Sequence, residues 1–139
     1  MGNNGTTMRR LYEAFGAGDV PSVLEAMDPQ IRWEEPEGMP LFTTQVGPYA
    51  VLENIFGTLQ TVFREFSVNV DEIHDVGDVV LALGVYRGMG AETGRTLEAH
   101  FAHVWRFGAD GKVTGFRTYT DTHLWREVLG ADMPASSAP

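Results

Sequence analysis

Glu35 is the residue whose surroundings in the sequence most clearly favour acid–base chemistry. The segment 31–35 alternates apolar and polar residues, which predicts a short β-strand that Pro36 ends. Side chains two apart on a strand point to the same face, so Glu35 shares the apolar side with Ile31 and Trp33. A carboxylate beside tryptophan and away from water has a raised pKa and suits a general base. The alternative is that the strand ends at Trp33 and that Glu35 is a solvated loop residue.

His103 is the single polar side chain on an otherwise apolar strand face. The segment 96–107 is predicted to form a strand, and one of its faces carries Leu97, Ala99, Phe101, His103, Trp105 and Phe107. An imidazole in that place could donate a hydrogen bond to a ligand, or pair with Glu35 and change its pKa. The alternative is a core histidine satisfied by a backbone carbonyl.

Arg87 is the third candidate for a role in chemistry. It follows Leu81, Leu83 and Val85 in strand parity, so its stem is expected to enter the concave face of the sheet near the rim. A guanidinium there could bind a carboxylate or an enolate oxygen, or pair with Glu35. The alternative is an exposed arginine at a strand end.

Two other polar residues favour simpler roles. His100 shares a polar face with Glu98 and Arg106, which indicates a surface position or a dimer contact. Asp121 directly precedes a helical pattern that starts at Thr122. An aspartate in that place is explained by helix N-capping, which we favour over a catalytic acid.

The remaining side chains predict an aromatic pocket without a metal or a cofactor. The histidines lack metal-ligand spacing, and neither a phosphate-binding glycine motif nor a Gly-x-Ser-x-Gly elbow is present. The candidate pocket walls, for each of which core packing is the alternative, are Trp33, Phe42, Tyr49, Phe56, Phe101, Trp105 and Phe116.

The elements that must position these side chains follow from the hydrophobic periodicity. It predicts helices near 8–15, 20–27, 48–63 and 122–129, and strands at 31–35, 66–70, 79–87, 96–107 and 112–120. The proline-containing segment 36–48 is interpreted as a mobile flap. Helices followed by a meander of long strands predict an α+β fold, in which a curved antiparallel sheet wraps around helices and leaves one apolar pocket.

Composition and charge limit the classes of function. The 139 residues predict one domain over 8–130, with disordered ends at 1–7 and 131–139. The net charge of −9 would repel nucleic acid and anionic membrane surfaces, so neither is an expected partner. No apolar run approaches the roughly 20 residues of a membrane span, and cysteine is absent. We expect a cytoplasmic protein.

Three local patterns add a family resemblance. Leu-Tyr-Glu-Ala-Phe-Gly-Ala-Gly-Asp at 11–19, His-Val-Trp-Arg-Phe with Asp-Gly-Lys-Val within 103–113, and Tyr-Thr-Asp-Thr at 119–122 resemble the SnoaL-like branch of the nuclear transport factor 2-like superfamily, which also holds ketosteroid isomerase. The resemblance implies a cone-shaped α+β barrel with a deep apolar pocket, commonly in a homodimer. It does not fix the reaction, because members include isomerases, cyclases, hydrolases and binding modules.

The resemblance also concerns individual residues. Glu35-Pro36-Glu37-Gly38 resembles the Asp-Pro-x-Gly stretch that holds the base of ketosteroid isomerase, with glutamate in place of aspartate. His103 falls where that enzyme keeps a protonated aspartic acid in its oxyanion hole. Its donor tyrosine falls on Leu11, and Tyr12 stands one step of roughly 100° around the helix, which is expected to turn the hydroxyl away.

These observations together predict a cofactor-independent enzyme that acts on a small apolar molecule. Glu35 would move a proton next to a carbonyl group, and His103 with Arg87 would stabilise the oxyanion. The reaction would be an isomerisation, cyclisation or dehydration in polyketide or terpenoid metabolism. The alternatives are a binding module that uses the same pocket without catalysis, and an epoxide hydrolase, which would require more pocket carboxylates around an arginine.

Overall fold

A computed structural model describes residues 3–130 of the protein. Its first elements are α1 (Asn3–Gly16), α2 (Val20–Glu25), β1 (Met27–Glu34) and the short strand β2 (Gln45–Val46). One helical segment follows, made of α3 (Pro48–Val51), a π-helical turn η1 (Leu52–Phe56) and α4 (Gly57–Val62). The last elements are β3 (Phe63–Val76), β4 (Val79–Gly90), β5 (Thr96–Phe107), β6 (Val113–Thr120) and α5 (Thr122–Leu129).

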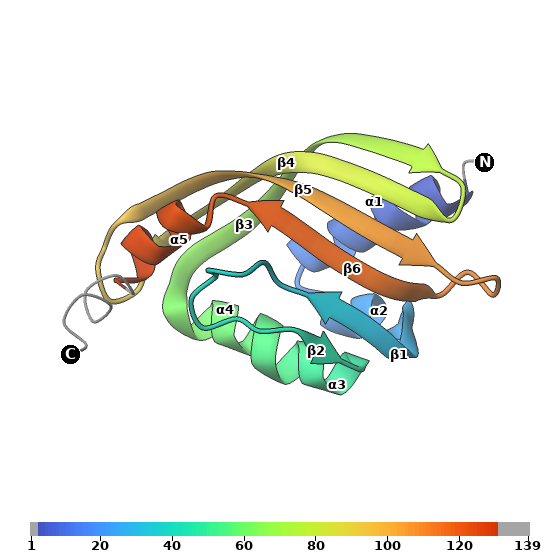
Figure 1. Ribbon diagram of the computed structural model, residues 1–139, viewed down its shortest axis with the longest axis horizontal. Coiled ribbons are helices and arrows are strands. Elements are labelled where there is room, and N and C mark those ends of the chain that lie inside the picture. Colours follow the sequence, from blue (N-terminus) through green and yellow to red (C-terminus); the bar gives the residue numbers. More distant parts are fainter. Residues whose placement is uncertain (1–2, 131–139) are drawn as a thin grey trace.

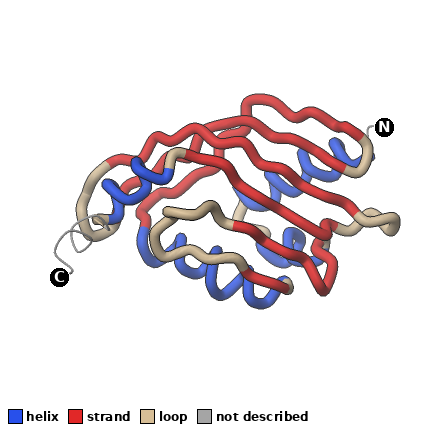
Figure 2. Tube along the Cα trace, viewed as in Figure 1, coloured by secondary structure: helices blue, strands red, loops and turns tan. Residues whose placement is uncertain are grey.

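The six strands form one curved sheet in the order β2-β1-β6-β5-β4-β3, which confirms the α+β class. The sheet arches over α1 to α4, which lie on its concave side, and α5 lies apart from them at one end of the sheet (Figures 1 and 2). Its edge strands β2 and β3 do not pair with each other, so the sheet has a cone-like shape and does not close into a barrel. The expectation of a purely antiparallel sheet is wrong, because β1 pairs with β6 in parallel. Turn residues predict hairpins between consecutive strands, but they carry no signal for such a distant partner.

Irregularities in the edge strand β3 contribute to the curvature. The pairing of β3 with β4 shifts register between Arg64 and Ser67 and again between Val70 and Glu72. Glu65, between the first two, has a φ of 58°. Bulges of this kind bend a strand and increase its twist. The bulges also explain why β3 is much longer than the predicted strand at 66–70. At each bulge the alternation of apolar and polar residues is interrupted, although the pairing with β4 continues.

Helix α1 begins at Asn3, earlier than the predicted disordered segment 1–7 allows. The backbone N–H of Gly5 donates to Oδ2 of Asp75 over 2.8 Å, and the side chain of Asn4 donates to the carbonyl oxygen of Gly77, also over 2.8 Å. The first N–H groups of a helix lack partners within it, and here a distant strand supplies one. Residues 1–2 and the predicted tail 131–139 lie outside the described residues.

The concave face of β5 packs against the helices as its alternation predicts. Leu97, Ala99, Phe101, His103, Trp105 and Phe107 are all buried. Helix α1 contributes Met8 and Leu11 to the same core, and the π-helical turn contributes Ile55 and Phe56. The aromatic side chains of the strands and helices therefore converge beneath the arch of the sheet.

We predict that Gly84→Ala in β4 lowers the free energy of unfolding by about 1–3 kcal/mol, measured by urea denaturation. A Cβ at this position would clash with the carbonyl oxygen of Asn69 and stand 2.7 Å from Cζ of Phe101. Gly16→Ala is the control, because a methyl group added at the end of α1 would meet nothing within 4 Å. Unchanged stability of the Gly84 variant would contradict the packing described.

Candidate functional site

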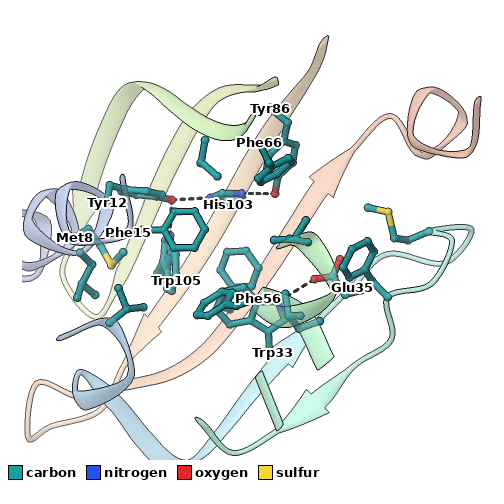
Figure 3. A pocket seen from close by; sticks show the side chains of 18 of the residues that line it. Met8, Tyr12, Phe15, Trp33, Glu35, Phe56, Phe66, Tyr86, His103 and Trp105 are labelled. Carbon is teal, nitrogen blue, oxygen red and sulfur yellow. Dashed lines mark hydrogen bonds between the residues drawn. The ribbon is translucent and has the colours of Figure 1, made fainter. Parts of the chain in front are cut away.

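A cavity of about 80 Å³ lies beneath the concave face of the sheet (Figure 3). Side chains from α1, from the helical segment 48–62 and from strands β3 to β6 line it, together with the end of β1. Its wall is almost wholly apolar. The polar exceptions are the carboxyl group of Glu35, the imidazole of His103 and the hydroxyl groups of Tyr12 and Tyr86. A volume of this size holds several water molecules or part of a small organic ligand.

Glu35 lies directly after β1 and lines the cavity, as the strand parity predicts. Its Oε2 accepts a hydrogen bond of 2.9 Å from Nε1 of Trp33. Burial raises the pKa of Glu35 to about 7, although the hydrogen bond from Trp33 acts in the opposite direction. The carboxyl group therefore exchanges a proton near neutral pH, which suits a general acid or base.

The neighbouring carboxylate, Glu34, is in the opposite electrostatic state. It points to the outer side of the sheet, where Nη1 of Arg117 donates to it over 2.7 Å and Nε of Arg32 over 2.9 Å. These hydrogen bonds, first that from Arg117 and then that from Arg32, lower the pKa of Glu34. One step along the strand thus separates an ion-paired carboxylate from one that has no counter-ion among residues 3–130.

His103 is 3% exposed, and tyrosine hydroxyl groups engage both of its ring nitrogens. Nδ1 lies 2.6 Å from the hydroxyl oxygen of Tyr12, and Nε2 lies 2.6 Å from that of Tyr86. Burial lowers the pKa of His103 to about 3, so the ring is neutral at physiological pH. Phe101 stacks on it with a centroid distance of 3.9 Å. The partners of His103 are therefore two hydroxyl groups, where a backbone carbonyl or Glu35 was expected.

The tyrosines extend this contact into a longer chain of hydrogen bonds. Nε1 of Trp105 donates to the hydroxyl oxygen of Tyr12 over 2.8 Å. At the other end, the hydroxyl groups of Tyr86 and Thr118 lie 2.8 Å apart. We refer to Trp105, Tyr12, His103, Tyr86 and Thr118 as the polar chain. It joins α1 to three strands of the sheet.

The expectation that Tyr12 turns its hydroxyl away is wrong. Tyr12 stands four residues after Met8 and three before Phe15, so the three side chains share one face of α1. That face lines the cavity. The position of α1 against β5, which no local pattern reveals, decides where the hydroxyl group of Tyr12 lies.

Arg87 was expected in the concave face and is instead exposed on the outer face. Its Nη2 lies 3.6 Å from Oε2 of Glu98. The inward residues of β4 include Ala82 and Tyr86. Ala82 and Gly84 stand inward where Leu81 and Leu83 stand outward, so the apolar pattern of β4 indicates the wrong face. The same misassignment hid Tyr86 from sequence reasoning.

The predicted aromatic walls divide into three groups. The cavity is lined by five of them, namely Trp33, Phe42, Phe56, Trp105 and Phe116. Phe101 is buried behind His103 and does not line it. Tyr49 is 70% exposed, and its hydroxyl group donates to Glu53, so its assignment to the pocket is wrong.

Asp121 caps α5, as expected. Its Oδ1 accepts from the backbone N–H groups of His123 and Leu124 over 3.1 and 3.4 Å. His100 is exposed. Within residues 3–130, no group of three or more histidine or acidic side chains is arranged to hold a metal ion. In the same range, no helix has the length and apolar character that crossing a membrane requires.

A family model described as a SnoaL-like domain matches residues 8–116. The chain belongs to the SnoaL-like family. The resemblance to this branch of the nuclear transport factor 2-like superfamily is thereby confirmed. Among curated proteins, none has a sequence that matches this SnoaL-like chain.

Solved structures share the fold. An NTF2-like protein from Burkholderia thailandensis E264 is 30% identical with a TM-score of 0.87, over 93% of this chain and 98% of its own. An NTF2-like protein of unknown function from Burkholderia pseudomallei K96243 is 33% identical with a TM-score of 0.84 over the same shares. TerC, co-crystallised with polyporic acid, is 27% identical with a TM-score of 0.80, over 91% of this chain and 98% of its own.

We predict that Glu35→Gln makes this SnoaL-like protein more stable at pH 8, by up to about 3 kcal/mol, and has little effect near pH 4. Folding raises the pKa of Glu35 from 4.5 to about 7, so the folded protein binds the proton more tightly. Its stability therefore falls as the pH rises through this window. Glutamine carries no charge and avoids that loss.

Urea denaturation at both pH values measures the difference. Glu37→Gln is the matched control, because Glu37 is exposed in the same loop and its substitution should leave stability unchanged at either pH. Equal stability of wild type and Glu35→Gln at pH 8 would show that the carboxylate is not desolvated.

Proposed function

We propose that the protein is a cofactor-independent enzyme that transfers a proton next to a carbonyl group of a small apolar molecule, with Glu35 as the general base. The observation that carries the proposal is a carboxyl group with a pKa of about 7 in a cavity walled by aromatic side chains. Such a group is deprotonated in about half of the molecules at neutral pH and can both accept and return a proton.

The proposed step needs only groups that this chain supplies. An oxygen of Glu35 takes the proton from the carbon next to the carbonyl, and the electron pair of the broken C–H bond moves to the carbonyl oxygen as an enolate. Return of the proton to another carbon completes an isomerisation. In a cyclisation, the enolate carbon attacks a second carbonyl of the same molecule, and the alkoxide formed takes the proton back from Glu35. In a dehydration, the enolate expels a hydroxyl group from the neighbouring carbon, and this group leaves as water with the proton that Glu35 held.

The negative charge that develops on the substrate oxygen is stabilised by a hydrogen-bond donor close to that oxygen. In Figure 3 the polar chain around His103 and the carboxyl group of Glu35 lie on different sides of the cavity. Aromatic side chains, among them Trp33 and Phe56, form the wall of the cavity between these two sides. This arrangement supports a flat, apolar substrate whose carbonyl oxygen faces the polar chain and whose acidic C–H group faces Glu35, of the kind found in polyketides or terpenoids.

The comparisons support this class without naming the substrate. Membership in the SnoaL-like family agrees with cofactor-free chemistry on small molecules. TerC, which shares the fold, was co-crystallised with polyporic acid, and an organic ligand in that relative agrees with a small-molecule cavity here. An epoxide hydrolase is less well supported. In residues 3–130 the cavity is lined by one carboxylate, Glu35, and by no arginine.

We predict that Glu35→Gln slows deuterium exchange next to the carbonyl of enolisable ketones by about 10²–10⁴-fold. A panel of such ketones in D₂O, followed by proton NMR, provides the assay. In the wild type the rate should rise with pH and level off above about 7, because the base acts in its deprotonated form. Glu37→Gln, in the same loop and exposed, should keep the wild-type rate.

Equal exchange rates for wild type and Glu35→Gln would contradict the proposed base. A wild type that binds the ketones without accelerating exchange would favour the second candidate, a non-catalytic binding module. One observation favours that candidate: the hydroxyl and imidazole groups that line the cavity already bond to one another.

We also propose that two copies of the chain associate through the outer face of the sheet. Across β4, β5 and β6, the residues Leu83, Ala102 and Tyr119 are register neighbours, and Leu81 and Val104 are paired beside them. Tyr119 is 50% exposed and the other four are half-buried. An apolar patch that no described helix covers is a surface suited to a symmetric contact.

We predict that the wild type sediments at micromolar concentration with twice the mass of one chain, and that Tyr119→Glu shifts it toward the 15.3 kDa monomer. The substitution places a charge in the apolar contact and removes the ring on which Arg117 packs, and the burial of a charge opposes association. Tyr49→Glu, at a position 70% exposed on the helical segment, should leave the dimer intact. A wild type that sediments as a monomer would contradict the proposed contact.

A further inference from the structure

The polar chain contains one more hydrogen than it has hydrogen bonds. Trp105, the neutral ring of His103 and the hydroxyl groups of Tyr12, Tyr86 and Thr118 each carry one polar hydrogen. Four contacts join these five groups: Trp105 to Tyr12, each tyrosine to His103, and Tyr86 to Thr118. In residues 3–130 none of the three hydroxyl groups has another partner. One hydroxyl hydrogen of the chain is therefore left without an acceptor.

The surplus hydrogen can belong to Thr118, Tyr86 or Tyr12, depending on which nitrogen of His103 is protonated. Thr118 is 2% exposed and does not line the cavity, so a surplus hydrogen there would be a buried, unsatisfied donor. Tyr86 is 7% exposed, and the rings of Phe66, Phe101 and Trp125 pack around it. Tyr86 also lines the cavity, but its side chain is nearly buried whereas that of Tyr12 is partly exposed, so a ligand oxygen reaches the hydroxyl group of Tyr86 less easily.

Tyr12 is the remaining position, and it satisfies every group in the interior. If Nδ1 of His103 is protonated, it donates to the oxygen of Tyr12, which also accepts from Trp105. Tyr86 then donates to Nε2 of His103, and Thr118 donates to Tyr86. The hydroxyl hydrogen of Tyr12 is left free at the wall of the cavity, on a side chain that is only partly buried.

The geometry points to Tyr12 as the donor of a hydrogen bond to the oxygen of a bound carbonyl or enolate, with His103 as a positioning residue that keeps this hydrogen free through its Nδ1–H tautomer. This inference rests on the proposed function, because it requires that the cavity binds a small molecule. It assigns the oxygen-binding role to Tyr12, since both nitrogens of His103 already have partners. Burial also raises the pKa of Tyr12, so its hydroxyl group keeps its hydrogen at neutral pH.

The oxyanion formed in the proposed reaction would thus be held by an oxygen that itself accepts two hydrogen bonds. Accepting a hydrogen bond polarises an O–H group and strengthens the bond it donates. The class of ligand follows from the count of hydrogen-bond donors and acceptors in the polar chain. The cavity offers a donor and no free acceptor at this end, so it should prefer a planar apolar molecule with a carbonyl oxygen over its hydrocarbon analogue.

The preference is tested with 2-indanone, which carries a carbonyl, and with indane, which has the same ring shape without an oxygen. Binding of each is followed by the fluorescence of the tryptophans, all three of which line the cavity. Tyr12→Phe should weaken binding of 2-indanone about tenfold and leave binding of indane unchanged. Tyr86→Phe and the exposed control Tyr49→Phe should retain the preference for the ketone.

A spectroscopic readout tests the role of His103. In the complex with 2-indanone, the ¹⁵N chemical shifts of its ring should show a protonated Nδ1 and an unprotonated Nε2. The inference is overturned if Tyr12→Phe weakens both probes equally, if Tyr86→Phe removes the preference instead, or if the complex carries the Nε2–H tautomer.

The outcomes also separate this inference from the proposed function. Glu35→Gln should still prefer 2-indanone over indane, even where it no longer catalyses exchange. Binding of indane and 2-indanone with equal affinity would overturn the role of Tyr12 and leave the role of Glu35 standing. A wild type that binds neither probe would overturn both.

Discussion

A neutral imidazole buried as deeply as His103 needs a hydrogen-bond partner on each ring nitrogen, because neither can reach water. One partner, Tyr12, comes from α1, and the other, Tyr86, comes from β4. Both contacts are 2.6 Å long, so they hold the first helix against the middle of the sheet. The cavity lies beside this junction, and its shape depends on the junction. The contacts of His103 with Tyr12 and Tyr86 therefore hold α1 against the sheet, and the same groups form the polar side of the candidate active site.

The two ends of the cavity differ in the kind of group they present. Around His103 the hydroxyl and ring groups are neutral and hydrogen-bond to one another. At the other end Glu35 has only the indole of Trp33 as a described partner, and burial raises its pKa to about 7. Its neighbour Glu34 has two arginines on the outer side of the sheet. The cavity wall thus carries a carboxyl group that no described residue neutralises, an unfavourable arrangement that is typical of functional sites.

The sequence predicted the parts of this site that alternate cleanly. In β5 every inward residue but one is apolar, so the burial of His103 followed from parity, and so did the direction of Glu35 after Trp33. The sequence predicted the strand β4 but not which of its faces is buried. Ala82 stands inward and Leu81 outward, so Arg87 was assigned to the wrong face. The start of α1 and the direction of Tyr12 depend on contacts with distant strands, and no local pattern encodes such contacts.

The central claim is that the fold holds one carboxyl group in an apolar cavity with its proton affinity raised into the neutral range. The most direct measurement is an NMR titration of the ¹³C-labelled carboxyl groups of the wild type, with the signal of Glu35 assigned by its loss in Glu35→Gln. The structure predicts a midpoint near pH 7 for this signal. A midpoint near 4.5, the ordinary value for glutamate, would contradict the account.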